Sequence, residues 1–331
     1  MSERPQHHDS QPSFTRRAVI SLGLGAVTFG GIFYVLGGRA PEPQVAPVVI
    51  PKQPTPESKP KISEYQRLEQ KIKGFDVRAR SRQEFESNAQ EVVKEAVAYY
   101  SNEIFSLTGE RSDQSLLLSK IKLHKNKSDF TASVAEETQS CEIKPSVLPD
   151  ALAFTGHESR KIDINLSKFY DDNTRGAHQQ LFGTLIHELS HGDIKAQIPP
   201  VVVTIEDRKV LWFNGFYIKL HTGQKPIDKE VCQGEIGRDI EEAYAEFIAQ
   251  KLLRKVNIVR DTNPYLRLAG NMERLLSQLR VKDPQIERKM ISLHRRSEIF
   301  EFAKLVAIAG GYVGNNELGQ GLTFLLDALA A

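Results

Sequence analysis

Apolar residues recur every three or four positions over two stretches in the middle of the chain. In QLFGTLIHELSHGD, residues 180 to 193, the apolar positions are Phe182, Leu185, Ile186 and Leu189. In RDIEEAYAEFIAQKLLRK, residues 238 to 255, they are Ile240, Ala243, Tyr244, Phe247, Ile248 and Leu252. This period places the apolar side chains on one side of a helix. We therefore predict two helices that pack on a core.

The rest of the chain after residue 61 predicts helices and short strands around these two segments. Helical periodicity covers residues 62 to 107, with an interruption at Gly74, and three later segments, 265 to 279, 284 to 309 and 319 to 330. Alternating or β-branched residues predict strands at 116 to 124, 130 to 137, 151 to 157 and 161 to 169. Residues 201 to 221 predict two or three strands, turned at Glu206-Asp207 and Asn214-Gly215.

The stretch from Lys161 to Leu166 alternates apolar and polar residues, as a half-buried edge strand does. An edge strand at this place would be able to bind an extended peptide by β-addition. An ordinary strand covered by a loop would show the same pattern. Both interpretations stay open from the sequence.

The N-terminus carries the pattern of a membrane or export segment. Twin arginines, Arg16 and Arg17, precede an uncharged run from Ala18 to Gly38 that is long enough to cross about 30 Å of hydrocarbon. A twin-arginine export signal, an uncleaved signal anchor and a transmembrane helix all fit residues 1 to 39. Each would place the rest of the chain outside the cytoplasm, as in a bacterial periplasm or at a cell surface, either exported or anchored to the membrane.

Residues 40 to 61 are expected to form an extended linker, because they hold seven of the 16 prolines. The remaining residues, 62 to 331, are sufficient for one sizeable core, with 40% of the whole chain hydrophobic. The net charge of +2 is close to balanced, and no basic stripe stands out in the sequence, so nucleic acid is not an expected partner. Cys141 and Cys232 would be either one disulfide or two buried thiols.

The first of the two helices carries metal-binding chemistry. His187 and His191 are one turn apart on the same side of the helix, and Glu188 is rotated from them by about 100°. Zinc suits a pair of neutral imidazoles, and a catalytic zinc site takes three protein ligands and a water. Glu188 would then act as the general base on that water, which is the peptidase interpretation of His-Glu-x-x-His.

The third ligand is expected from the second helix. A metzincin continuation is excluded, because Ile194 and Gln197 stand where that class has glycine and histidine. Glu242 and Glu246 lie four positions apart on one face, so one would bind the metal while the other holds a histidine through its free ring nitrogen. Glu241 and Glu235 are rival ligands, since a small error in helix phase exchanges neighbours.

These residues resemble the gluzincin metallopeptidases, in which a glutamate on a second helix completes His-Glu-x-x-His. Glu242-Ala243-Tyr244-Ala245 followed by Glu246 matches the family's pattern, although the usual supporting acid there is aspartate. There is a further likeness to small bacterial zinc peptidases with a Glu-x-x-Ala helix, in which asparagine stands at the position of Glu246. The resemblance spans roughly residues 180 to 255.

The resemblance implies an α+β, zincin-like fold with a mixed sheet and the metal-binding helix in an upper lobe. A mainly helical lower lobe would follow at about residues 257 to 331. It also implies one Zn²⁺ per chain on His187, His191 and Glu242, with Glu188 catalytic and Glu246 supporting. An inhibitory prosegment would fall within residues 62 to 107.

A peptidase also needs a donor for the oxyanion, and His221, Tyr217 and Tyr244 are available. The aromatic residues Trp212, Phe213, Phe216 and Tyr217 would line either a specificity pocket or the core. The expected function is a zinc-dependent peptidase that acts on peptide or protein substrates. A metal-dependent amidase acting on cell-wall material and an inactive zincin-fold binding protein are the alternatives.

Overall fold

A computed structural model describes residues 62–78, 81–138, 151–156, 159–172, 176–195, 201–203, 209–222, 232–260 and 265–311, together with residues 321, 323, 325 and 328. The predicted N-terminal segment, the proline-rich linker and Cys141 lie outside the described residues, as does the side chain of Cys232. No helix within the described ranges combines the length and apolarity that a bilayer span requires.

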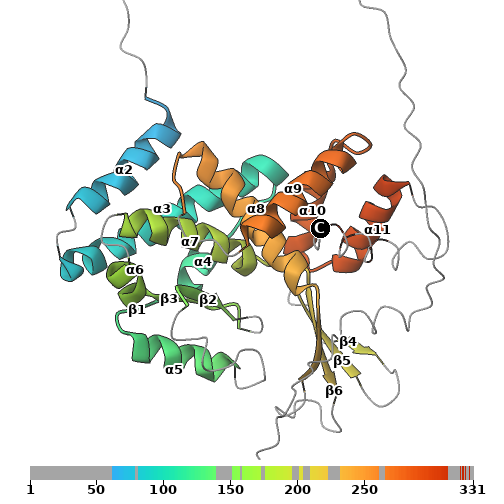
Figure 1. Cartoon of the computed structure of the whole chain (residues 1–331), viewed down its shortest axis with the longest axis horizontal. Helices are drawn as coiled ribbons and strands as arrows, with labels where there is room; N and C mark the ends of the chain where they lie inside the picture. The colour runs from blue at the N-terminus through green and yellow to red at the C-terminus, as the bar shows by residue number, and fades with distance from the viewer. Residues whose placement is uncertain are drawn as a thin grey trace, which may run out of the picture.

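The described chain is mainly helical and contains two small sheets (Figure 1). The helices are α2 (Glu64–Arg78), α3 (Arg82–Thr108), α4 (Gln114–Lys120), α5 (Lys127–Thr138), α6 (Leu166–Asp172), α7 (Ala177–Gly192), α8 (Arg238–Lys255), α9 (Leu266–Arg280), α10 (Ile286–Arg295) and α11 (Ile299–Gly310). The strands are β1 (Ile121–His124), β2 (Ala153–Thr155), β3 (Ile162–Asn165), β4 (Val201–Val203), β5 (Lys209–Asn214), β6 (Tyr217–Thr222) and β7 (Cys232–Ile236). The α+β class is therefore confirmed.

The first sheet has the order β1-β3-β2, with β1 parallel and β2 antiparallel to β3. Ile162 and Ile164 of β3 belong to the main core, whereas Phe154 of β2 packs with Phe130 and Val134 of α5. The prediction of an edge strand at residues 161 to 166 is wrong, because β3 is the central strand and all four of its residues are buried. The edge nearest α7 is β2.

Three segments predicted as strands are helical in whole or in part, since residues 166 to 169 fall in α6, and in the other two short polar side chains start the helix. Residues 130 to 137 fall in α5, where the side chain of Asn126 accepts a hydrogen bond from the backbone N–H of Asp129 at 2.9 Å. Residues 116 to 120 fall in α4, which Asp113 caps by accepting from the N–H of Leu116 at 2.9 Å. Such caps supply backbone partners that a strand would not use.

The breaks between helices also differ from the prediction at two places. Helix α2 continues through Gly74, and the next helix, α3, begins at Arg82 after the N-cap Ser81, which forms a capping box with Glu84. The helix predicted over residues 284 to 309 is two helices, α10 and α11, because Ser297 between them has a positive φ of 57°. The predicted helix at 265 to 279 corresponds to α9.

Helix α7 is fixed at both ends by residues far away in the sequence. Its N-cap, Gly176, has no side chain, and Asp76 of α2 accepts hydrogen bonds from the N–H groups of His178 at 2.7 Å and Gln179 at 3.3 Å. At the other end, Asp193 lies 3.0 Å from the guanidinium of Arg295. Helix α2, which buries Ile72 in the main core, is therefore an integral part of the domain.

The second sheet is antiparallel, in the order β4-β5-β6-β7, and projects from the helical body (Figure 1). The turn at Asn214-Gly215 joins β5 to β6 as predicted. This turn points toward the helices, where the N–H of Gly215 donates to the hydroxyl of Ser297 at 3.0 Å. The hairpin is thereby attached to the segment between α10 and α11.

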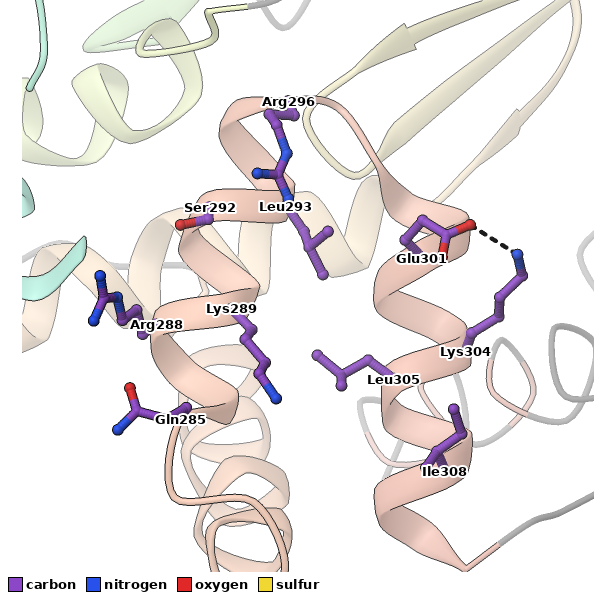
Figure 2. A pocket seen from close by; sticks show the side chains of 10 residues that line it. All are labelled: Gln285, Arg288, Lys289, Ser292, Leu293, Arg296, Glu301, Lys304, Leu305 and Ile308. Carbon is purple, nitrogen blue, oxygen red and sulfur yellow. Dashed lines mark hydrogen bonds and ion pairs between the residues drawn. The ribbon is translucent and has the colours of Figure 1, made fainter. Parts of the chain in front are cut away.

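Figure 2 shows a groove of about 630 Å³ between the antiparallel helices α10 and α11. Leu293 and Leu305 project into it from the two helices. Its rim cations are largely paired with acids, since Lys289 bonds Asp283 at 2.7 Å, Arg296 bonds Glu298 at 3.0 Å and Lys304 bonds Glu301 at 2.7 Å. None of the residues predicted to bind metal lines this groove.

Candidate metal centre

Three of the predicted ligands come together where α7 packs against α8. The Nε2 atoms of His187 and His191 are 3.3 Å apart, and Glu242 Oε2 lies 3.5 Å from the first and 3.6 Å from the second. Both histidines are buried, and the Glu242 side chain is 17% exposed. These three atoms form a nearly equilateral triangle and could hold one metal ion.

The carboxylate oxygen in this triangle lacks an ordinary partner. Glu242 Oε2 is buried and makes no hydrogen bond to any described residue. Its separations from the two imidazole nitrogens exceed the usual hydrogen-bond distance. A buried carboxylate oxygen without a hydrogen bond is costly, and a bound cation would satisfy it.

Each histidine has a carboxylate at its other ring nitrogen. His191 Nδ1 lies 2.9 Å from Glu241 Oε1, and His187 Nδ1 lies 3.0 Å from Glu246 Oε2. A carboxylate that is hydrogen-bonded at Nδ1, as Glu241 is to His191, fixes the ring orientation and leaves Nε2 able to bind a metal. Glu246 thus has the expected supporting position. Glu241 contacts the side of His191 that faces away from the triangle, so it lies at a supporting position and not in the triangle.

Glu241 is held by three donors. Besides His191, it accepts hydrogen bonds from His294 Nε2 at 2.9 Å and from the backbone N–H of Phe216 at 2.7 Å. Burial alone would raise the pKa of Glu241, but the charge of His294 and the bonds from His191 and His294 outweigh it. The pKa of this carboxyl is therefore held below its usual range, and the group stays ionised.

Burial would lower the pKa of His191, but its hydrogen bond to Glu241 and the negative charges of Glu241 and Glu242 raise the pKa well above the ordinary value. The carboxylates therefore favour a protonated imidazole when no metal is present. A metal that binds here has to displace that proton, so metal affinity is expected to increase with pH.

The tip of the β5–β6 hairpin lies against the carboxylate of Glu241. Gly215 has a positive φ of 59°, and a Cβ atom at this position would overlap both Glu241 Oε2 and His294 Nε2. Only glycine fits the turn, because it has no Cβ and accepts positive φ at no steric cost. The Asn214-Gly215 turn therefore brings the N–H of Phe216 to Glu241, the carboxylate that is bonded to His191.

Glu188, the predicted general base, lies beside strand β2. Its carboxylate is buried, and its Oε2 accepts a hydrogen bond from Thr155 Oγ1 at 2.5 Å. Glu188 thus lies on the side of α7 that faces the sheet, as its rotation from His187 predicts. The hydroxyl of Thr155 had no motif to mark it in the sequence.

Tyr265 is a second residue that sequence reasoning missed. Its ring is parallel to that of His187, with a centroid separation of 6.0 Å and an angle of 2°. Burial, assisted by the charges of Glu242 and Glu188, raises the pKa of Tyr265 to about 12. The phenol is therefore neutral at physiological pH and can donate a hydrogen bond. Its position at the start of the predicted helix at 265 carried no chemical signal.

Among the predicted oxyanion donors, Tyr244 alone has a described side chain, and it does not reach the triangle. Tyr244 is fully buried and stacks on His294 at 3.7 Å, on the side of α8 away from Glu242. The side chains of Tyr217, His221 and the rival ligand Glu235 lie outside the described residues, although their strands are described. Phe216 is a core residue that stacks on Phe302 at 4.6 Å, and the side chains of Trp212 and Phe213 are also outside the described part.

The geometry around His187, His191 and Glu242 is the evidence for a site in this chain. Comparison with known proteins gives no match to a family model, to a curated protein or to a solved structure.

Proposed function

We propose that this protein is a zinc-dependent peptidase, with His187, His191 and Glu242 as the zinc ligands. The proposal rests on the distances between the two Nε2 atoms and Glu242 Oε2. With bonds of about 2.0–2.1 Å, a tetrahedral zinc separates its ligand atoms by about 3.3–3.4 Å, whereas octahedral geometry at that bond length gives about 3.0 Å. The observed separations of 3.3, 3.5 and 3.6 Å agree with tetrahedral coordination.

Two histidines and one carboxylate are a ligand set of catalytic zinc sites, which keep one position open. When bound, zinc polarises a carbonyl and lowers the pKa of a water molecule toward neutrality. Glu188 follows directly on the ligand His187 and is held by Thr155, so it is placed to act as general base. It takes a proton from the attacking water and gives it to the amine nitrogen when the C–N bond breaks.

Strand β2 is proposed to bind the peptide substrate. Among the described strands β2 pairs only with β3, so its other side is an edge, and it carries Thr155 next to the general base. An extended peptide that paired with this edge would lie beside Glu188. The predicted export segment supports a reaction outside the cytoplasm.

The first test is the zinc content of the purified full-length protein by elemental analysis. We expect one zinc per wild-type chain, and loss or marked weakening of binding in Glu242→Ala, because two histidines alone hold zinc poorly. Asp239→Ala on the exposed first turn of α8 is the matched control and should keep the metal. A folded wild-type protein that binds no zinc would instead support a binding protein.

Substrate class is tested on the zinc-loaded protein with a peptide library and with cell-wall fragments. Cleavage of peptides supports the peptidase. Cleavage of wall amides alone would replace it with the amidase, since the same zinc chemistry serves both bonds.

Tyr265 is proposed to donate a hydrogen bond to the oxyanion that forms at the substrate carbonyl. Its phenol is neutral, and its ring lies against His187. Tyr265→Phe keeps the stacked ring but removes the donor, so kcat should fall about 10²- to 10³-fold with the zinc content unchanged. Steady-state kinetics on a cleaved peptide measures this. Tyr65→Phe, which removes a hydroxyl bonded to Glu103, is the control and should keep full activity. A Tyr265→Phe variant as active as wild type would exclude the role.

A further inference from the structure

The hydrogen bond between Thr155 and Glu188 joins the edge strand to the proposed general base. Thr155 Oγ1 donates to Glu188 Oε2 at 2.5 Å, across 33 positions of sequence. Thr155 is 7% exposed and Glu188 is 9% exposed, so water has little access to replace this bond. A hydroxyl that donates to a carboxylate makes one of the stronger protein hydrogen bonds, because the acceptor is charged.

The pleat of the sheet determines where the hydroxyl points. Phe154 packs on the α5 side with Phe130, and successive residues of a strand face opposite sides. Thr155 therefore faces α7, and its Cα is in register with Ile162 of the central strand. A β-branched side chain has few χ1 rotamers, so the strand presents the hydroxyl at a fixed place.

A glutamate side chain has several rotatable bonds, and it loses reactivity when its carboxylate samples orientations away from the water. One oxygen of Glu188, Oε2, is engaged by Thr155. We propose that Thr155 is a positioning residue that holds the Glu188 carboxylate in the orientation needed for proton transfer, with Oε1 as the basic oxygen. This inference rests on the proposed function. Thr155 also belongs to β2, the strand that would bind the peptide. It would therefore fix the position of the Glu188 carboxylate relative to the scissile bond.

The test compares Thr155→Val, Thr155→Ser and Thr184→Val with wild type in the full-length, zinc-loaded protein. Valine has the shape of threonine without the hydroxyl, so Thr155→Val should lower kcat about 10- to 100-fold. KM and zinc affinity should stay within about threefold of wild type, because the Thr155 hydroxyl is bonded to Glu188 and not to His187, His191 or Glu242. Thr155→Ser restores the hydroxyl and should restore most of kcat.

Thr184→Val is the matched control. Thr184 lies one turn before Glu188 on the same helix, and its buried hydroxyl makes no hydrogen bond to a described residue. This variant should therefore keep wild-type kcat. The inference is overturned if Thr155→Val keeps full kcat, if it loses zinc, or if Thr155→Ser is as impaired as Thr155→Val.

Crystals of the wild type and of Thr155→Val separate this inference from the proposed function. We expect the Glu188 carboxylate to leave its position in Thr155→Val, and an unmoved carboxylate would contradict the positioning role. If the zinc-loaded wild type cleaves no peptide, the peptidase proposal fails and the catalytic part of this inference with it. The crystals then decide independently whether Thr155 orients Glu188.

Discussion

The Glu188→Gln variant is expected to bind zinc like the wild type and to lose peptide hydrolysis by about 10³-fold or more in kcat/KM. Glutamine has nearly the same size as glutamate, and its amide oxygen can still accept the hydrogen bond from Thr155. It cannot take a proton from water at neutral pH. The loss would therefore come from the missing base rather than from a rearranged site.

The measurement is kcat/KM on a cleaved peptide, together with zinc content by elemental analysis. Glu91→Gln is the matched control, because Glu91 lies on α3 with an exposed side chain that pairs with Lys71 at 3.1 Å. It should keep wild-type activity. Substantial hydrolysis by Glu188→Gln would assign proton transfer to another group.

The Arg295→Ala variant is expected to lower the free energy of unfolding by about 3–5 kcal/mol. Arg295 is fully buried, and its Nε lies 3.0 Å from Asp193 Oδ2. Its guanidinium also donates to the carbonyl of Arg111 at 3.1 Å and to the hydroxyl of Ser112 at 3.1 Å. Removing the cation leaves Asp193 as a buried charge without its counterion at the C-terminal end of α7.

The pH dependence of this effect follows from Asp193. Burial raises the pKa of Asp193 even though Arg295 lowers it, and loss of Arg295 should raise it further. A carboxyl with a raised folded-state pKa binds its proton more tightly in the native protein than in the unfolded chain. The protonated carboxyl therefore contributes to the free energy of unfolding at low pH. This contribution is lost as the pH rises from the pKa of the unfolded state to the pKa of the folded state. The loss in Arg295→Ala should accordingly be larger at neutral pH than at acidic pH.

Urea unfolding of the metal-free protein at several pH values measures this change without interference from metal release. Arg296→Ala is the control at the next position, where the side chain is 47% exposed and pairs with Glu298 at 3.0 Å. It should cost less than about 1 kcal/mol. Equal losses in the two variants would show that the buried pair does not stabilise the helix end.

The apolar period of the sequence was sufficient to predict α7 and α8, although the structure buries every residue of α7 except Gln179 rather than one stripe. It also placed His187 and His191 on one side, since residues four apart on a helix are neighbours. The choice between Glu241 and Glu242 required the rotation of α8 about its axis. That rotation is fixed by contacts of Glu241 with Phe216 and His294, which come from other parts of the chain.

The misassigned segments show where periodicity lacks information. Phe130 and Val134 suit one face of a helix, yet a short stretch of seven or eight residues with alternating character also resembles a strand. The hydrogen bond from the N–H of Asp129 to the side chain of Asn126 favours the helix, and Asn126 lies outside the apolar pattern. Thr155 and Tyr265 were missed for a related reason, because tertiary packing alone brings them to α7.

Helix α7 is bonded at its start to Asp76 and at its end to Arg295, and each bond spans 102 positions of sequence. A nascent chain that ends after α8 already contains His187, His191 and Glu242, but it lacks Arg295 and the His294 that is bonded to Glu241. Long loops have to close before such contacts form, and this makes them late events in folding. The arrangement of His187, His191 and Glu242 is therefore completed only when the chain as far as α10 has folded, so a metal bound by these residues would enter after folding rather than nucleate it.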